Sequence, residues 1–347
     1  MICIIIILFI IILLLYYYIH KKNNQNICRS LEKYTTTRAP DVEFPFRNIK
    51  DDKYKNLNII AITAPFRTNE HKNLFYKYKS DGFPILGVCS YQAFPSPINN
   101  PHEDPYFAKH NDDYVNQVIG WCHCYRPENK MLQLIKHTPH KLISESDFLN
   151  LDNMTYDPSI PKVYDFIYVC LQDNDMCTDG WQSFIRQWNL AKKCFGTLCD
   201  HKLKGLIIGR DKCKMDFVHN CNIEIEAVPF QPYHEFHKYI QKSRMLFVPN
   251  ISDASPRVIT EAMVYNVPVL VNTKIIGGWK YIQKNTGEFF DGSPEHFYTQ
   301  FMKMRTKKYS PRNFILKNNN KVKKQFTTFL KQIYPSLLDC KYCRFAI

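Results

Sequence analysis

The segment from residue 245 to residue 268 constrains the fold most strongly. It opens with a short apolar run, residues 245–249, which is typical of a buried strand. Ser255 and Pro256 are typical of an N-cap and a first helical residue, and Asn266, just before Val267-Pro268, marks the end of that helix. The segment therefore predicts a strand, a loop and a helix in succession, which is the repeating unit of a parallel α/β sheet.

Two carboxylates lie around the start of this predicted helix. Asp253 falls in the loop and Glu261 on the second helical turn. The unpaired N–H groups near Ser255 and Arg257, at the positive end of the helix dipole, would attract a diphosphate. Carboxylates accept hydrogen bonds from ribose and hexose hydroxyls. The layout predicts a site for a nucleotide sugar, although an ordinary capped helix of an α/β domain would contain the same residues.

The pattern Asp253-x7-Glu261-Ala262-Met263, followed by residues 267–271 and Gly277-Gly278, resembles the donor-binding domain of GT-B glycosyltransferases, especially family 4 or group 1. The usual family motif is Glu-x7-Glu, so Asp253 is one methylene shorter. The resemblance covers roughly residues 165–298. It implies an α/β fold of two Rossmann-like, doubly wound parallel-sheet domains facing a cleft. It also implies transfer of a hexose, with retention of configuration, from a nucleotide-diphosphate sugar to a hydroxyl of a glycan, lipid or protein-linked acceptor.

Under this resemblance Glu261 would hold the ribose and Asp253 the transferred sugar. Developing negative charge on the departing phosphate calls for cations and N–H donors. The family's usual Arg and Lys pair after the first strand of this domain is not evident here. The candidates for binding the diphosphate therefore come from two other segments, residues 209–212 and residues 255–261. The expected donor-binding set is Gly209, Arg210, Lys212, Ser255, Pro256, Arg257 and Glu261.

The acceptor side offers fewer signals. His123 occupies roughly the place where related enzymes carry a histidine near the reacting sugar, and its pKa range suits proton handling. Arg67, after the first predicted strand, would face the same cleft, although a strand histidine can also be purely structural. The resemblance implies no cofactor and no metal. Cys122-x-Cys124 and Cys340-x2-Cys343 lack a second ligand pair with zinc-finger spacing.

The first residues predict a membrane anchor. Ile2 to Ile19 contains no charged residue and as a helix would extend about 27 Å, close to the thickness of a bilayer core. A cleaved signal peptide is the competing interpretation. The basic residues after this run, His20-Lys21-Lys22, place the body of the protein in the cytosol, with a luminal orientation as the alternative. The 13 cysteines are then expected to be mostly buried thiols.

Composition shifts divide the 347 residues into segments. We expect an anchor over 1–22, a polar stem over 23–53, an N-terminal acceptor domain over 54–160 and a nucleotide-sugar domain over 161–310. In the second half, strands over 164–170, 203–208 and 223–228 alternate with helices over 180–195 and 233–242, as in a parallel sheet. Residues 311–347 are expected to form a basic helix and tail.

The net charge of +14 suits an anionic partner, and residues 296–338 contain no acidic residue. The basic face of the C-terminal helix could be a solvated surface or could lie on anionic lipid. Nucleic acid is not expected as a partner, because the aromatic residues of this segment fall on one helical face, as a core requires. A GT-B scaffold without catalytic activity, acting as a membrane-tethered binding protein, remains the alternative to an enzyme.

Overall fold

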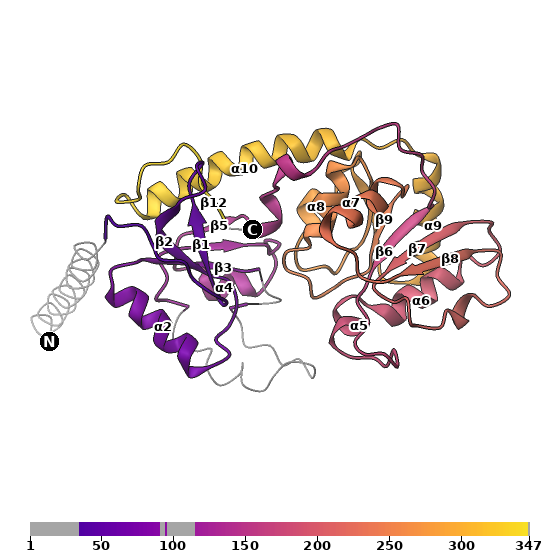
Figure 1. The fold of residues 1–347 in the computed structure, drawn as a ribbon, viewed down its shortest axis with the longest axis horizontal. Helices are drawn as coiled ribbons and strands as arrows, with labels where there is room; N and C mark the ends of the chain where they lie inside the picture. Colours follow the sequence, from indigo (N-terminus) through magenta and orange to yellow (C-terminus); the bar gives the residue numbers. More distant parts are fainter. Residues whose placement is uncertain (1–34, 91–93, 96–114, 346–347) are drawn as a thin grey trace, which may run out of the picture.

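The computed structural model describes residues 35–90, 94–95 and 115–345. The expected membrane helix, Ile2 to Ile19, and the first part of the expected stem lie outside the described residues. Among the residues that are described, no helix is both long enough and apolar enough to cross a membrane. Figure 1 shows two lobes lying side by side, with one long helix, α10, running along the top of both.

The N-terminal lobe contains a six-stranded sheet with the order β12-β1-β2-β3-β4-β5. Strands β2 to β5 are parallel, whereas β1 pairs antiparallel with both β2 and β12. The strands are β1 (Phe46–Lys50), β2 (Asn56–Ile62), β3 (Ile85–Val88), β4 (Trp121–His123), β5 (His140–Leu142) and β12 (Arg344–Phe345).

Both faces of this sheet are buried. Ile60 and Ile62 of β2 pack on one face with residues of α2 (Asn69–Ser80) and α4 (Met131–Ile135). Ile59 and Ala61 point to the opposite face, because side chains alternate along a strand. That face is covered by α10. The near-continuous apolar run of β2 therefore reflects a parallel strand with a helix layer on each side.

The C-terminal lobe contains a second six-stranded sheet, with the order β11-β10-β9-β6-β7-β8 and all neighbours parallel. The strand order reverses between β6 and β9, and open α/β sheets bind ligands at the carboxyl ends of strands at such a point. The strands are β6 (Phe166–Val169), β7 (Lys204–Ile208), β8 (Glu224–Val228), β9 (Leu246–Val248), β10 (Val269–Asn272) and β11 (Gly287–Phe290).

Helices cover both faces of this sheet as well. One face packs against α6 (Trp188–Gly196) and α9 (Pro294–Thr306). The other packs against α7 (Tyr233–Gln241) and α8 (Arg257–Val264). These two layers confirm the doubly wound α/β architecture expected from the alternation of strands and helices.

The helix expected over 180–195 is interrupted. It consists of α5 (Trp181–Ile185) and α6, and Gln187 between them has a φ of 55°. The left-handed region rarely continues a helix. The start of α5 is fixed by Asp173, which accepts hydrogen bonds from the backbone N–H groups of Gly180, Gln182 and Ser183. The break leaves Arg186, the residue after α5, at a bend.

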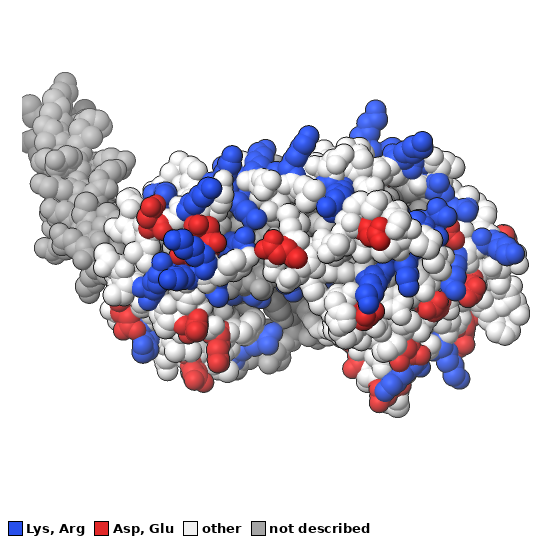
Figure 2. Space-filling model, turned by 45° about the horizontal axis from the view of Figure 1, so that its top comes forward, with Lys and Arg blue, Asp and Glu red and all other residues white. Residues whose placement is uncertain are grey.

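Helix α10 (Pro311–Ile333) joins the two lobes. Its first half packs on the C-terminal lobe through Ile315, and its second half buries Val322, Phe326 and Leu330 in the N-terminal lobe. The sequence predicted the part of this apolar face that contains Phe326 and Leu330. Figure 2 shows basic side chains along the upper edge of the molecule, where α10 lies.

Two expected boundaries are corrected by the structure. The chain beyond α10 returns to the N-terminal lobe, where β12 pairs with β1 (Figure 1). Residues 46–50, assigned to the stem, form the strand between β12 and β2, and Ala39 is buried. The N-terminal lobe therefore includes residues on both sides of the expected range 54–160. The backbone N–H and C=O groups of β1 are paired only when β2 and β12 lie beside it.

Six of the described cysteines form disulfides, four of them in the C-terminal lobe. Cys177 is bonded to Cys213 and Cys199 to Cys221, with Cα–Cα distances of 5.5 and 4.6 Å, and Cys340 is bonded to Cys343. The expectation of mostly buried thiols is wrong for these six cysteines. It holds for the five described cysteines that are free, all of which are buried.

Candidate active site

A cleft of about 550 Å³ lies between the two lobes, at the carboxyl ends of β6 and β9. Arg47, Ser90 and Glu145 line it from the N-terminal lobe. Arg186 and the loop before α7 line it from the C-terminal lobe, together with the loop and first two turns of α8. Five of the residues expected at the donor site line this cleft: Asp253, Ser255, Pro256, Arg257 and Glu261.

The loop between β9 and α8 forms one wall of the cleft. The helix begins at Arg257, so the N-cap is Pro256 and not Ser255 as expected. The Ser255 hydroxyl instead accepts a hydrogen bond from the Ser146 N–H of the other lobe, at 2.9 Å. The Ile259 N–H already donates to the Pro256 carbonyl at 3.1 Å, so the N–H groups of Arg257 and Val258 are the first-turn donors of α8 at the edge of the cleft.

A pair of glycines lets a second loop pack tightly against this wall. Gly277 donates its N–H to the Asp253 carbonyl at 2.8 Å, and a Cβ at Gly277 would lie 1.8 Å from the Ala254 carbonyl oxygen. Gly278 has a φ of 78°, which L side chains rarely adopt. Only glycine fits either position, and the close packing fixes the backbone around Asp253.

Asp253 is held by a cation that the sequence did not identify. Its Oδ2 atom accepts from Arg186 Nη1 at 2.5 Å and from Asn250 Nδ2 at 3.1 Å, while its Oδ1 accepts from the Ser255 N–H at 3.2 Å. Both side chains of the ion pair retain some exposure to the cleft, 30% for Arg186 and 16% for Asp253. The carboxylate is thereby oriented, and a guanidinium lies beside the α8 terminus.

Glu261 lies deeper, with 8% of its surface exposed. Burial raises the pKa of its carboxyl group, and the Arg257 guanidinium and the Tyr233 hydroxyl partly oppose that shift. Burial also raises the pKa of Tyr233 to about 12. Glu261, Arg257 and Tyr233 also line an adjoining cavity of about 240 Å³ that reaches residues 148–153. A buried carboxylate facing two cavities is placed to accept hydrogen bonds from hydroxyls of a ligand.

Arg47 and Glu145 form an ion pair on the opposite wall, with 2.8 Å between Nε and Oε1. An arginine and a carboxylate therefore form an ion pair on each wall of the cleft. Sequence reasoning missed Arg186, Arg47, Glu145 and Tyr233. A signal for Arg186 was present, because it is the first basic residue after β6, where the family's basic pair was expected.

The two lobes meet beneath the cleft through Asp147, a fully buried residue of the short 3₁₀ turn Glu145–Asp147. Its carboxylate pairs with Lys280 and accepts from the Tyr281 hydroxyl at 2.8 Å and from Asn318 Nδ2 at 3.2 Å. These partners come from the C-terminal lobe and from α10. They fix the position of Glu145 and Ser146 against the α8 loop.

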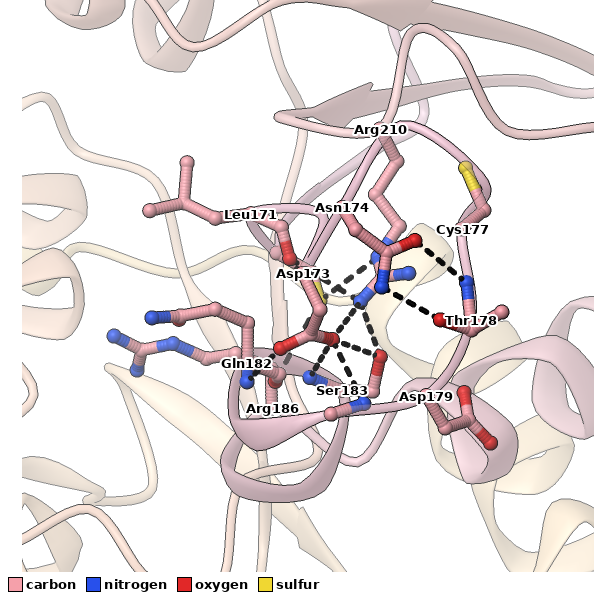
Figure 3. Close-up of polar contacts among 12 residues, drawn as sticks. Leu171, Asp173, Asn174, Cys177, Thr178, Asp179, Gln182, Ser183, Arg186 and Arg210 are labelled. Atoms are coloured by element: carbon pink, nitrogen blue, oxygen red, sulfur yellow. Dashed lines mark hydrogen bonds and ion pairs between the residues drawn. The ribbon is translucent and has the colours of Figure 1, made fainter. Parts of the chain in front are cut away.

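Arg210 lies elsewhere (Figure 3). It is fully buried, donates to Ser183 Oγ at 2.6 Å and to the Leu171 carbonyl at 3.1 Å, and lies 3.6 Å from the Asp173 carboxylate. Its guanidinium also lies over the Trp188 ring. These contacts hold the loop after β6 against the start of α5. They argue against the expected contact of Arg210 with a diphosphate.

Gly209 and Lys212, its neighbours, do not line the cleft either. Gly209 has a φ of 96°, and a Cβ there would lie 2.9 Å from the Cys170 carbonyl oxygen. Gly209 therefore allows close packing against the protein backbone and not against a phosphate. Lys212 pairs with Asp175 at 2.7 Å on the surface. The expected donor-binding group thus separates into a cleft-lining part and a part that packs the loops of β6 and β7.

His123 lies in a strand as expected, at the end of β4, but is buried and does not line the cleft. Burial, with smaller effects of His140 and Lys280, lowers the pKa of its imidazole to about 3. Its Nε2 lies 3.3 Å from His140 Nδ1, and its Nδ1 is buried without a hydrogen-bond partner. The ring is therefore neutral, with one nitrogen unsatisfied.

Arg67 is also outside the cleft. Its guanidinium lies 4.4 Å from the centre of the Phe44 ring, on the surface between β2 and α2. Within the described part of the chain, no group of three or more histidine, cysteine, aspartate or glutamate side chains is arranged to hold a metal ion.

Comparisons with known proteins agree with this geometry. Residues 187–321, which include α6 to the first half of α10, match the model of the family "Glycosyl transferases group 1". The match covers the α8 loop and Glu261 and begins one residue after Arg186. No curated protein matches the chain in sequence.

Several solved structures share the fold. A sucrose-phosphate synthase from Thermosynechococcus elongatus superposes with a TM-score of 0.58 at 10% identity, over 80% of this chain and 74% of the other. HepE of Anabaena, in complex with UDP and glucose, superposes with a TM-score of 0.54 at 10% identity, over 77% of this chain and 78% of HepE.

A mutant of TarM from S. aureus, in complex with Fondaparinux, α-GlcNAc-glycerol and UDP, gives a TM-score of 0.52 at 11% identity. That superposition covers 76% of this chain and 51% of the other, so this chain corresponds to about half of TarM. Together with the two-lobed fold and its cleft, the family match leads to one conclusion: this chain has the GT-B fold that these glycosyltransferases share, and residues 187–321 of its C-terminal lobe form a group 1 glycosyl transferase domain.

Proposed function

We propose that the protein transfers a hexose from a nucleoside-diphosphate sugar to a hydroxyl of an acceptor bound on the N-terminal lobe. The observation that carries this proposal is the convergence of the α8 N-terminus, Arg186, Asp253 and Glu261 on one cleft. Cations and amide dipoles suit the diphosphate, and the two carboxylates suit the hydroxyls of the two sugars.

Each residue has a distinct task in this proposal. The bond between the anomeric carbon and the β-phosphate oxygen breaks, and the acceptor oxygen forms the new bond to the same carbon while its proton leaves towards the departing phosphate. Arg186, Arg257 and the first N–H groups of α8 stabilise the negative charge that develops on that phosphate. Glu261 holds the ribose and Asp253 the transferred hexose. We extend the proposal to retention of configuration, which rests on the family.

The acceptor is proposed to be a glycan or a lipid-linked sugar, approached from the side of Arg47 and Glu145. Arg47 and Glu145 are already paired, so an acceptor hydroxyl would find one donor and one acceptor group side by side. His123 has no task in this proposal, because it is buried outside the cleft and its lowered pKa excludes a proton-donating imidazolium at neutral pH.

A thermal-shift screen against the common nucleotide sugars tests the donor class. A ligand that binds only the folded protein raises its melting temperature, by roughly 5 °C at about a hundred times its dissociation constant. We expect one nucleotide sugar, and the matching nucleoside diphosphate, to produce such a shift. If no nucleotide sugar shifts the melting temperature at millimolar concentration, the proposed donor class is wrong.

An inactive GT-B scaffold is the second candidate. It is favoured by the Asp253–Arg186 ion pair, which occupies both side chains before any ligand is present. A scaffold would bind the nucleotide sugar without turning it over. Donor hydrolysis or transfer above the level of the Glu261→Ala variant separates the enzyme from the scaffold.

We infer further that the body of the protein lies on the luminal side of a membrane, anchored by Ile2 to Ile19. Two disulfides that tie loops of the C-terminal lobe, Cys177–Cys213 and Cys199–Cys221, suit an oxidising compartment. Peptide mapping of protein whose free thiols are blocked at lysis should recover both linked pairs. Alkylation of all four cysteines without prior reduction would place the lobe in the cytosol instead.

A further inference from the structure

A second and smaller cavity, of about 90 Å³, lies where β1, β12 and α10 meet on the N-terminal lobe. Its polar lining consists mainly of cations: Lys50 from β1, Arg344 from β12 and Lys323 from α10. The remaining wall is mostly aromatic and apolar, formed by Tyr54, Phe148, Leu149 and Phe345, together with Asn150.

Two of the cations are direct neighbours across the sheet. Lys50 and Arg344 are register partners in the antiparallel pair β1–β12, so their side chains project from the same face. Like charges directly opposite each other destabilise a strand pair. The Arg344 guanidinium lies 4.5 Å from the centre of the Tyr54 ring, which orients it at the cavity without neutralising it.

The third cation approaches from the helix. Lys323 is half-buried, whereas Lys321 and Lys324, its neighbours on α10, are exposed. Burial, and then repulsion from Arg344, lowers the pKa of the Lys323 ammonium, and Asp152 opposes this only in part. Among the residues that the structure describes, no carboxylate forms an ion pair with Lys50, Lys323 or Arg344. Three cations from three distant segments therefore share one hollow in which none of them is ion-paired.

A polar side chain without a partner lies at the same place. Asn150 Oδ1 is buried and accepts no hydrogen bond. Such a group costs free energy unless a ligand satisfies it. Phe148, Leu149 and Asn150 line both this cavity and the 240 Å³ cavity beside Glu261, but the cations do not reach the donor cleft. The small cavity is thus separate from the proposed diphosphate site.

We propose that this cavity is a second binding site, and that it binds a phosphate group. Two lysines and an arginine provide the charge-assisted donors that phosphate oxygens require. The volume admits one phosphate group. The group can come from a soluble sugar phosphate or from a lipid headgroup, since both present the same chemistry.

The test uses the full-length protein and inorganic phosphate as the first probe, at constant ionic strength set with chloride. We expect phosphate to raise the melting temperature of the wild type and of Lys324→Met, the matched control on the exposed side of α10. In Lys323→Met the apparent affinity for phosphate should fall about tenfold or more. Equal phosphate affinity in Lys323→Met and Lys324→Met would mean that phosphate binds elsewhere, for instance in the donor cleft, and would overturn the proposal.

The stability of the variant without phosphate provides a second readout. Removing one of three mutually repelling cations should leave the free energy of unfolding unchanged or raise it. If Lys323→Met is markedly destabilised in the absence of phosphate, the ammonium group serves the fold and the site is not built for a ligand. Arg344→Gln should reproduce the loss of phosphate affinity.

Two further arms distinguish the sources of the phosphate. Both arms use the full-length protein in detergent, with glucose 1-phosphate added in one and mixed micelles with or without phosphatidate added in the other. A Lys323-dependent shift with the sugar phosphate assigns a soluble ligand. A Lys323-dependent shift with phosphatidate micelles alone assigns a lipid. Either result supports the site, and Lys323-independent binding in both arms contradicts it.

Discussion

The Glu261→Gln variant is expected to lose roughly a hundredfold in kcat/KM for sugar transfer. Glu261 is buried at the cleft, and its charged oxygens would each accept a ribose hydroxyl. A hydrogen bond to a charged group contributes about 1.5–3 kcal/mol, and tenfold in rate corresponds to about 1.4 kcal/mol. An amide keeps the shape but offers one acceptor and loses the charge. The measurement is steady-state transfer, or donor hydrolysis, with the nucleotide sugar identified by thermal shift.

The stability of this variant separates a lost contact from a lost fold. Burial raises the folded-state pKa of Glu261, so its ionised form costs stability at neutral pH, and that cost disappears as the pH falls below the unfolded-state pKa. The melting temperature of Glu261→Gln at pH 7 should therefore be at least as high as that of the wild type. Glu295→Gln, on α9 and outside the cleft, is the control and should keep full activity. Activity of Glu261→Gln within a factor of three of the control would refute the role assigned to Glu261.

The Arg186→Gln variant is expected to lose about 10²- to 10³-fold in kcat. Arg186 is the cation that the cleft offers in place of the family's basic pair, and removing one preorganised donor from developing charge has an effect of that size in other enzymes. The donor's dissociation constant should rise much less than kcat falls, because the leaving phosphate gains charge mainly in the transition state. Single-turnover kinetics together with donor binding measure the two effects separately.

Arg186→Lys and Arg244→Gln complete this experiment. Lysine keeps the charge but not the two-pronged geometry, so it should recover only part of the lost rate. Arg244 is an exposed arginine that pairs loosely with Asp165 away from the cleft, and its substitution should leave kcat unchanged. If Arg186→Gln retains a normal kcat, Arg186 serves only to position Asp253 and another group must stabilise the leaving phosphate.

The parts of the fold that the sequence predicted are those with local signals. Pro256 and Asn266 bracket α8 to within a residue or two, and Asn266 adopts the positive φ that ends such helices. Strand β1 was missed because it follows a proline-rich stretch and exists only through pairing with β2 and with the distant β12. The break at Gln187 was missed because it depends on Asp173 fixing the start of α5.

In the candidate site, too, the residues with local sequence signals were predicted and those that depend on distant contacts were not. Asp253 and Glu261 share one short segment, so their spacing alone indicated a shared task. Arg186 reaches the cleft only because the helix ends at Ile185, which no local pattern revealed. Arg210 follows a glycine at a strand end, as a phosphate-binding arginine would, but Ser183 and Asp173 bury it. Its position depends on loops that are far apart in the sequence.

The most direct test of the central claim is a crystal structure of the protein with the nucleoside diphosphate of its donor. The diphosphate should lie within hydrogen-bond distance of the Arg186 guanidinium and the first N–H groups of α8, and the ribose hydroxyls should contact Glu261. A nucleotide bound outside this cleft, with Arg186 and Glu261 untouched, would contradict the account.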